Sequence, residues 1–189
     1  MRIERVDVLG DEPIELPDAR RHCRVHGRDD DDYLFGLIKA ARELCEHHTQ
    51  RALVLSRFRQ HLECWPAYGP IRLDRPPLVA VESVTYTDTA DQQQTLPADQ
   101  YAVSTGDGGR VALVSGASWP GLSSYAEEPA SVTFTAGYGS VPETVKQACR
   151  MLVSHWYEHR TAVVMGRPPA EVPMAVDSCL NSVTWGRYA

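Results

Sequence analysis

The stretch Ser131–Arg160, SVTFTAGYGSVPETVKQACRMLVSHWYEHR, decides the fold. It opens on an alternating run in which Val132 and Phe134 alternate with Thr133 and Thr135, as in a strand with one buried face. The run ends in the glycine-rich turn 136–139, and a long amphipathic helix begins at Pro142. Apolar residues recur along that helix at steps of three and four: Val145, Cys149, Leu152, Val153, Trp156 and Tyr157.

Three further helices are expected, near residues 16–25, 31–50 and 174–183. The acidic run Asp29–Asp32 supplies an N-cap and favourable charge for the second of them. A calcium loop is the competing interpretation of this run, but no glycine or distal glutamate follows at EF-hand spacing. One face of the second helix is apolar and must be buried: Leu34, Leu37, Ile38, Ala41, Leu44, Cys45 and His48.

Between residues 52 and 136 the period changes from helical to alternating, which predicts strands separated by turn-rich segments. The expected strands cover residues 54–62, 71–73, 79–87, 100–104, 110–114 and 131–135. Residues 1–15 are expected to form an extended arm, and residues 88–97 a turn.

The order of helices, then strands, then helices indicates an α+β fold rather than a parallel sheet. We expect a small α-helical bundle (16–51 and 142–183) with an inserted antiparallel β-subdomain (53–137) and a C-terminal tail (184–189). At 189 residues, the chain is expected to be a single domain.

Composition excludes several classes of protein. The formal charge of −6 argues against a surface that grips nucleic acid. No apolar run approaches the length of a membrane helix, and the N-terminus lacks a signal-peptide pattern, so we expect a protein made in the cytoplasm.

Five widely spaced cysteines without a C-x-x-C motif argue against a disulfide framework. Cys45 and Cys149, on apolar helix faces, are expected to be small buried residues.

His155, Glu158 and His159 form a literal H-x-x-E-H string, the motif of one class of zinc protease. Two histidines four residues apart share a helix face, and the glutamate would act as general base. A catalytic zinc usually needs a third protein ligand, yet the only acidic residues beyond His159 are Glu171 and Asp177. Trp156 and Tyr157 also read as core positions. We therefore reject this metal site, with a small zinc hydrolase kept as the alternative function.

Cys45, His47 and His48 form a second cluster, since Cys45 and His48 are three apart on the second helix. No orienting Asn or Asp is identifiable for a nucleophilic site. The sequence also contains no P-loop and no G-x-S-x-G motif. It gives no positive indication of catalysis and implies no cofactor.

A set of motifs in fixed order covers residues 14 to 165. The early helix has the form L-x-x-A-x-x-H-x-R-V, and the second helix ends A-A-R-E-L-C-E-x-x-T-x-R-A-L. There follow R-x-x-L-x-x-W-P, I-x-L-x-R-P-P-L, V-x-S-V-x-Y, L-P-x-x-x-Y-x-V and S-W-P. The set closes with V-T-F-T-A-G-Y-G, V-P-E-x-V-K-Q-A and H-W-Y-E-H-R, so that H-x-x-E-H lies inside the pattern of the third helix.

This ordered set resembles the phage head–tail connector family, also called adaptor or head-completion proteins, which occurs in tailed phages, prophages and gene transfer agents. The resemblance implies a structural virion protein rather than an enzyme, without a cofactor. Its relatives form a twelve-fold ring under the portal, extend the DNA channel and dock the stopper or tail. The implied partners are further copies of the chain, the portal protein and the stopper or tail, with DNA passing through without sequence-specific binding. A tail-side stopper or terminator remains a further alternative.

Two surfaces are candidates for these contacts. The C-terminal tail carries large aromatic residues, which at a chain end usually pack against the same chain or a partner protein. The candidate portal contact is therefore formed by Val183, Trp185, Arg187 and Tyr188. The turn Gly106, Asp107, Gly108 and Gly109 lacks the spacing of a phosphate-binding loop and reads as a hairpin turn. It is the candidate tail-side loop.

Overall fold

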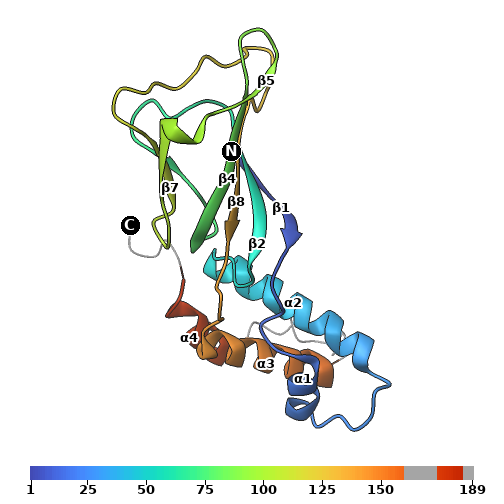
Figure 1. The fold of residues 1–189 in the computed structure, drawn as a ribbon. Coiled ribbons are helices and arrows are strands. Elements are labelled where there is room, and N and C mark those ends of the chain that lie inside the picture. The colour runs from blue at the N-terminus through green and yellow to red at the C-terminus, as the bar shows by residue number, and fades with distance from the viewer. Residues whose placement is uncertain (160–173, 185–189) are drawn as a thin grey trace, which may run out of the picture. The chain divides into compact units, whose positions relative to one another are not determined.

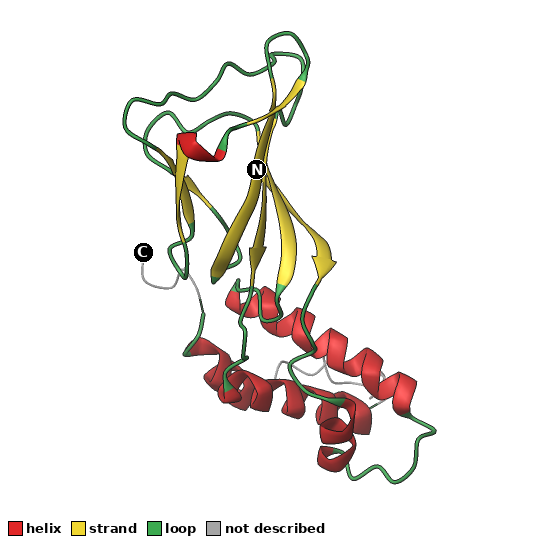
Figure 2. Ribbon diagram, in the orientation of Figure 1, coloured by secondary structure: helices red, strands yellow, loops and turns green. Residues whose placement is uncertain are grey.

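The structure, a computed structural model, describes residues 1–159 and 174–184. The chain folds into two compact units. Met1–Gly10 and Val54–Tyr138 form a β unit, while Asp11–Leu53 and the described residues from Gly139 onward form a helical unit. Figures 1 and 2 show the β-strands confined to the first unit and the α-helices to the second. The predicted α+β fold class, with an antiparallel sheet inserted between helices, is confirmed.

The larger sheet of the β unit has five strands in the order β1-β2-β8-β4-β5, all paired antiparallel. Their bounds are β1 Arg2–Val8, β2 Ser56–Leu62, β4 Leu78–Thr87, β5 Gln93–Thr95 and β8 Ala130–Ala136. Along β8, buried and half-buried side chains alternate, as the sequence predicts for this strand. Phe134 of β8 stacks on Phe58 of β2, with both rings buried and their centroids 5.8 Å apart.

A smaller sheet contains β3 Ile71–Arg72, β6 Tyr101–Ser104 and β7 Arg110–Leu113 in the order β3-β7-β6. A short 3₁₀ helix, Ala98–Gln100, precedes β6. The turn that joins β6 to β7 is attached to β4, because Leu78 and Gly106 exchange two backbone hydrogen bonds of 2.9 and 2.8 Å. The three short strands lie where the sequence predicts them.

Two strands were missed. The segment expected as an extended arm is extended, but Arg2–Val8 pairs with β2 and forms the edge of the sheet. Its pairing with β2 shifts register at a bulge between Arg5 and Asp7, and the strand contains several charged residues. Charges and bulges protect an exposed sheet edge against further pairing. The segment 88–97, expected as a turn, contains the short strand β5 paired with the end of β4.

The helical unit consists of α1 Leu16–His22, α2 Asp31–Thr49, α3 Glu143–Glu158 and α4 Met174–Asn181. Helix α2 packs on α3, which in turn packs on α4, and α1 contacts both α2 and α3. The helices bury small and branched residues: Leu34, Ile38, Ala41 and Cys45 of α2, Val145, Ala148, Cys149, Leu152 and Val153 of α3, and Val176 and Leu180 of α4. Among the described residues, no helix is long and apolar enough to cross a membrane.

The burial of α2 departs from the expected apolar stripe. Leu37, Leu44 and His48 are only half-buried, whereas three polar residues, Arg42, Glu46 and Thr49, are buried. Trp156 and Tyr157 of α3 are likewise half-buried rather than core residues, because the core stripe of α3 ends at Val153. Apolar periodicity therefore located the helices, but it did not identify all the residues that they bury.

Helix ends also differ from expectation. Asp30 precedes α2 as its N-cap, but no side-chain hydrogen bond caps the helix. Asp31 instead forms an ion pair with Arg20 of α1, and Asp30 accepts a hydrogen bond from Tyr157. Helix α1 stops at His22 because Arg24 adopts a left-handed conformation (φ 56°). Its end is closed by hydrogen bonds from Arg24 and Val25 to the carbonyls of Arg21 and Arg20.

A buried ion-pair network centres on Arg42, whose side chain is 4% exposed. Its Nη1 and Nε lie 2.9 Å from a carboxylate oxygen of Glu46 and 2.8 Å from one of Glu12. Burial disfavours the charged guanidinium, but the attraction of Glu46 and Glu12 outweighs it, so the pKa of Arg42 is raised. Glu46 also accepts a hydrogen bond of 2.9 Å from the backbone N–H of Leu53. One cation thereby holds the segment before α1 and, through Glu46, the segment after α2.

A close backbone crossing in the β unit requires glycine at position 137. Gly137 has a φ of +132°, and a Cβ added there would lie 2.5 Å from the carbonyl oxygen of Val54. Gly139, two residues later, has no atom within 4 Å of an added Cβ. The two glycines therefore differ in constraint although they share one turn.

Replacing Arg42 by alanine leaves Glu12 and Glu46 in a buried site without their cation. We expect this change to lower the free energy of unfolding by about 3–5 kcal/mol, the usual result of breaking a buried pair. Arg57→Ala is the matched control, since Arg57 forms ion pairs with Asp7 and Glu82 while remaining 36% exposed. It should cost much less than the change at Arg42, because its ion pairs are partly exposed to solvent. Urea denaturation measures both, and equal losses would contradict the central role of Arg42.

Gly137→Ala should lower the free energy of unfolding by about 2–3 kcal/mol, because it combines an unfavourable φ with a clash against backbone. Gly139→Ala should change it by less than about 0.5 kcal/mol. Thermal denaturation of the two variants side by side provides the comparison. A loss of similar size in both would show that the crossing at Gly137 is not constrained.

Candidate functional site

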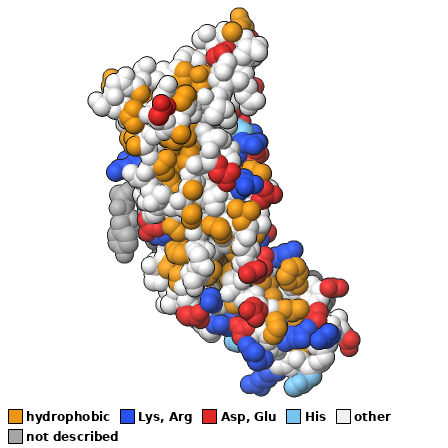
Figure 3. Space-filling view, in the orientation of Figure 1, with side chains coloured by type: hydrophobic (Ala, Val, Ile, Leu, Met, Phe, Trp, Pro, Cys, Tyr) orange, Lys and Arg blue, Asp and Glu red, His pale blue; other side chains and the backbone are white. Residues whose placement is uncertain are grey.

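Ion pairs cross the strands on the solvent-facing side of the five-stranded sheet. Arg57 of β2 binds Asp7 of β1 and Glu82 of β4, each at 2.8 or 2.9 Å. In Figure 3, acidic and basic side chains alternate over the part of the β unit where β1 and β2 lie. The hydrogen bonds from Arg57 are the main reason that the pKa of Glu82 is lowered. This face carries both signs of charge and is already internally paired.

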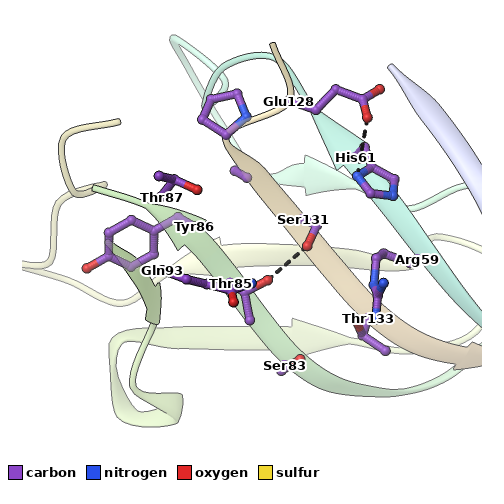
Figure 4. A pocket seen from close by; sticks show the side chains of 12 residues that line it. Arg59, His61, Ser83, Thr85, Tyr86, Thr87, Gln93, Glu128, Ser131 and Thr133 are labelled. Atoms are coloured by element: carbon purple, nitrogen blue, oxygen red, sulfur yellow. Dashed lines mark hydrogen bonds and ion pairs between the residues drawn. The ribbon is translucent and has the colours of Figure 1, made fainter. Parts of the chain in front are cut away.

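A polar hollow of about 300 Å³ lies on the same face of the sheet, over β2, β8 and β4. Figure 4 shows hydroxyl side chains of β4 and β8 along its floor, with Arg59, His61 and Glu128 to one side. His61 lies between two carboxylates, with Nε2 3.3 Å from Glu4 and Nδ1 3.4 Å from Glu128. Glu128 also accepts hydrogen bonds from Arg2, which are the largest cause of its lowered pKa.

The hollow does not have the arrangement of a hydrolytic site. The hydroxyl of Ser131 shares a 2.8 Å hydrogen bond with Thr85 rather than with a ring nitrogen of His61. A serine nucleophile needs a base within hydrogen-bond reach, and the ring nitrogens of His61 are directed at carboxylates instead. The side chains of the hollow can instead bind a polar group. They also link β1 to β2 and to the segment before β8.

The H-x-x-E-H string lies at the end of α3. The helix ends at Glu158, and His159 leaves the helical conformation with φ −113° and ψ 60°. Its Nδ1 lies 2.9 Å from the carbonyl oxygen of His155, although the two imidazole rings are 4.7 Å apart. Glu158 and His159 are exposed. Within residues 1–159 and 174–184, no three His, Cys, Asp or Glu side chains come together as a metal site requires. Glu171 lies outside the described residues.

The second cluster separates in the structure. The sulfur of Cys45 lies 3.8 Å from that of Cys149, with both residues fully buried between α2 and α3. The hydrogen bond between Cys149 and Cys45, together with burial, raises the pKa of Cys149, which keeps the thiol protonated and unreactive. His48 instead has Nδ1 3.9 Å from Asp177 of α4, and His47 is exposed. The expected role of Cys45 and Cys149 as small buried residues is confirmed.

The two candidate contact surfaces have different structural contexts. The backbone N–H and carbonyl of Val183 bind Leu180 and Arg51, so this residue is held on the helical unit. Trp185, Arg187 and Tyr188 lie outside the described residues. In the Gly106–Gly109 turn, Gly109 is buried and its added Cβ would lie 2.7 Å from Leu78, whereas Asp107 and Gly108 are exposed. Only the middle of this turn is therefore open to a partner.

Comparison with protein families decides between a structural and an enzymatic protein. The model of the head completion protein family matches residues 14–166, from the approach to α1 through both units. The chain belongs to the head completion protein family. The resemblance found in the sequence is thus confirmed over the predicted span. Head completion is a structural task in the virion, so this family member is a structural protein and not an enzyme, and the zinc hydrolase alternative has no support.

Solved structures share the whole fold. A chain in the virion of a native gene transfer agent particle matches with a TM-score of 0.78, and chains in the necks of an empty and a native particle match with 0.80 and 0.77. Each is 21% identical and is aligned over 100% of this chain and 98% of its own length. The two neck structures were computed with C6 and C12 symmetry, respectively. No curated protein matches the chain in sequence.

Proposed function

We propose that this head completion protein is the subunit of a twelve-fold homo-oligomeric ring at the head–tail junction of a phage-like particle. The observation that carries the proposal is the family match over residues 14–166. The fold shared along the whole chain with neck components supports it, since one of those necks was computed with C12 symmetry. The ring extends the DNA channel beneath the portal and docks the stopper or tail. The subunit is made in the host cytoplasm and works in the virion.

The physical properties of the chain suit this task. A closed ring requires head-to-tail contacts between two different surfaces of each subunit. The two compact units supply distinct surfaces, and we assign both of them to one connector domain. A net charge of −6 favours a channel along which DNA slides without sequence-specific binding, because the phosphate backbone is not attracted to an acidic wall.

The portal contact is assigned to the C-terminal tail, through Val183, Trp185, Arg187 and Tyr188. Aromatic residues and arginine are enriched in protein interfaces. The structure anchors the start of this tail on the helical unit, at Val183. The opposite contact, with the stopper or tail, is assigned to the Gly106–Gly109 turn, whose exposed part is Asp107 and Gly108.

Deleting residues 184–189 should abolish binding to the portal protein of the same particle while leaving the chain folded. The deletion removes Trp185, Arg187 and Tyr188 and only one described hydrogen bond, from Thr184 to the carbonyl of Leu180. Binding to immobilised portal, with circular dichroism of each variant, measures both effects. Met174→Ala is the control, because Met174 is an 89% exposed apolar residue of α4 outside the tail. Unchanged portal binding by the truncated chain would refute the assignment.

A further inference from the structure

Three loops of the β unit are joined at one end of its sheets. We name residues 63–70, 87–92 and 114–129 the loop end, and Figure 1 shows them at the same end of the unit as β5. The indole N–H of Trp65 donates to the carbonyl of Pro120 at 2.9 Å, and its ring stacks on Trp119 at 4.6 Å. Ser123 donates its N–H to the carbonyl of Thr87 at 2.9 Å and its hydroxyl to Asp91. These contacts hold the loops in one arrangement.

Two tyrosines of the loop end are almost fully exposed. Tyr68 is 95% exposed and Tyr125 is 86% exposed, while Trp65 and Trp119 of the same two loops are half-buried. Single exposed apolar residues are normal on a protein surface. Here two nearly fully exposed aromatics occur on loops that side-chain contacts already order. Tyrosine on an ordered loop supplies a large contact area at low cost in conformational entropy, as in binding loops.

The charge of the loop end is one-sided. Its three segments contain no lysine or arginine, whereas they contain five carboxylates: Glu63, Asp88, Asp91, Glu127 and Glu128. The N-terminal ammonium and Arg2 neutralise Glu63 and Glu128. Of the others, Asp88 and Asp91 accept hydrogen bonds within the loops. Figure 3 shows this end of the β unit with apolar and acidic side chains and without a basic one.

We propose that the loop end is a docking surface for a tail-side protein whose matching surface has apolar pockets for Tyr68 and Tyr125 and a basic rim. This inference rests on the proposed function and names the chemistry of its second partner. Electrostatic complementarity selects a basic partner surface, because an acidic one would be repelled. Large aromatic side chains that fill pockets contribute most of the affinity at such interfaces.

The loop end is distinct from the Gly106–Gly109 turn. The turn is hydrogen-bonded to Leu78 at the start of β4, whereas the loop end includes the turn that follows β4 at Thr87. The two surfaces therefore lie at opposite ends of that strand. Either of them can be altered without touching the other, so the contribution of the loop end to tail joining can be measured on its own.

The test uses heads that lack this chain, loaded with purified variants and then mixed with tails purified from the same particle. Tyr68→Ala/Tyr125→Ala should load on heads as the unchanged chain does, but join tails at least about tenfold less. Glu127→Lys should also reduce joining, and added salt should weaken joining by the unchanged chain. Phe35→Ala, which alters a 44% exposed aromatic of α2, should join tails normally.

Normal tail joining by the double tyrosine variant would overturn the inference. Failure of the unchanged chain to load on heads would instead refute the proposed function, and the inference with it. Thermal denaturation of the double variant separates a binding defect from a folding defect. Because both tyrosines are exposed, the unfolding midpoint should stay within about 2 °C of that of the unchanged chain.

Discussion

The buried ion-pair network of Arg42 is the constraint on which the helical unit depends. A charge inside a protein is tolerated only when it is paired and hydrogen-bonded, so its partners must hold their places. Those partners are Glu12, before α1, and Glu46, which also accepts the N–H of Leu53. The chain enters the helical unit after β1 and leaves it before β2 through these two segments. Arg42 thus holds both of these connecting segments, the one that follows β1 and the one that precedes β2.

Much of this fold follows from sequence patterns, and the exceptions have physical causes. The alternation of β8 and the periodicity of α3 are strong because each element buries one apolar face. Strand β1 was missed because RIERVDV carries charges on a bulged edge, where burial does not impose alternation. Arg42 and Glu46 were missed as core residues because periodicity counts apolar residues only. Their burial depends on partners elsewhere in the chain.

In the candidate site, too, some features could be predicted from the sequence and others could not. H-x-x-E-H satisfied the spacing of a zinc motif, but spacing assumes a continuous helix, and α3 ends before His159. The wider ordered set of motifs identified the family, because it tests many positions at once. The loop end had no sequence signature. In the sequence, Tyr68 and Tyr125 are not distinguishable from other tyrosines in turn regions. Their loops are brought together by the contacts of Trp65 with Trp119 and of Ser123 with Asp91, which only the structure shows.

Native mass spectrometry of the purified chain, alone and mixed with the portal protein of the same particle, tests the central claim most directly. A connector subunit should contain no bound metal and should join the portal as a closed multiple of subunits, twelve for the ring proposed here. Stoichiometric zinc on a subunit that does not associate with the portal would contradict the account. It would return His155, Glu158 and His159 to consideration as a metal site.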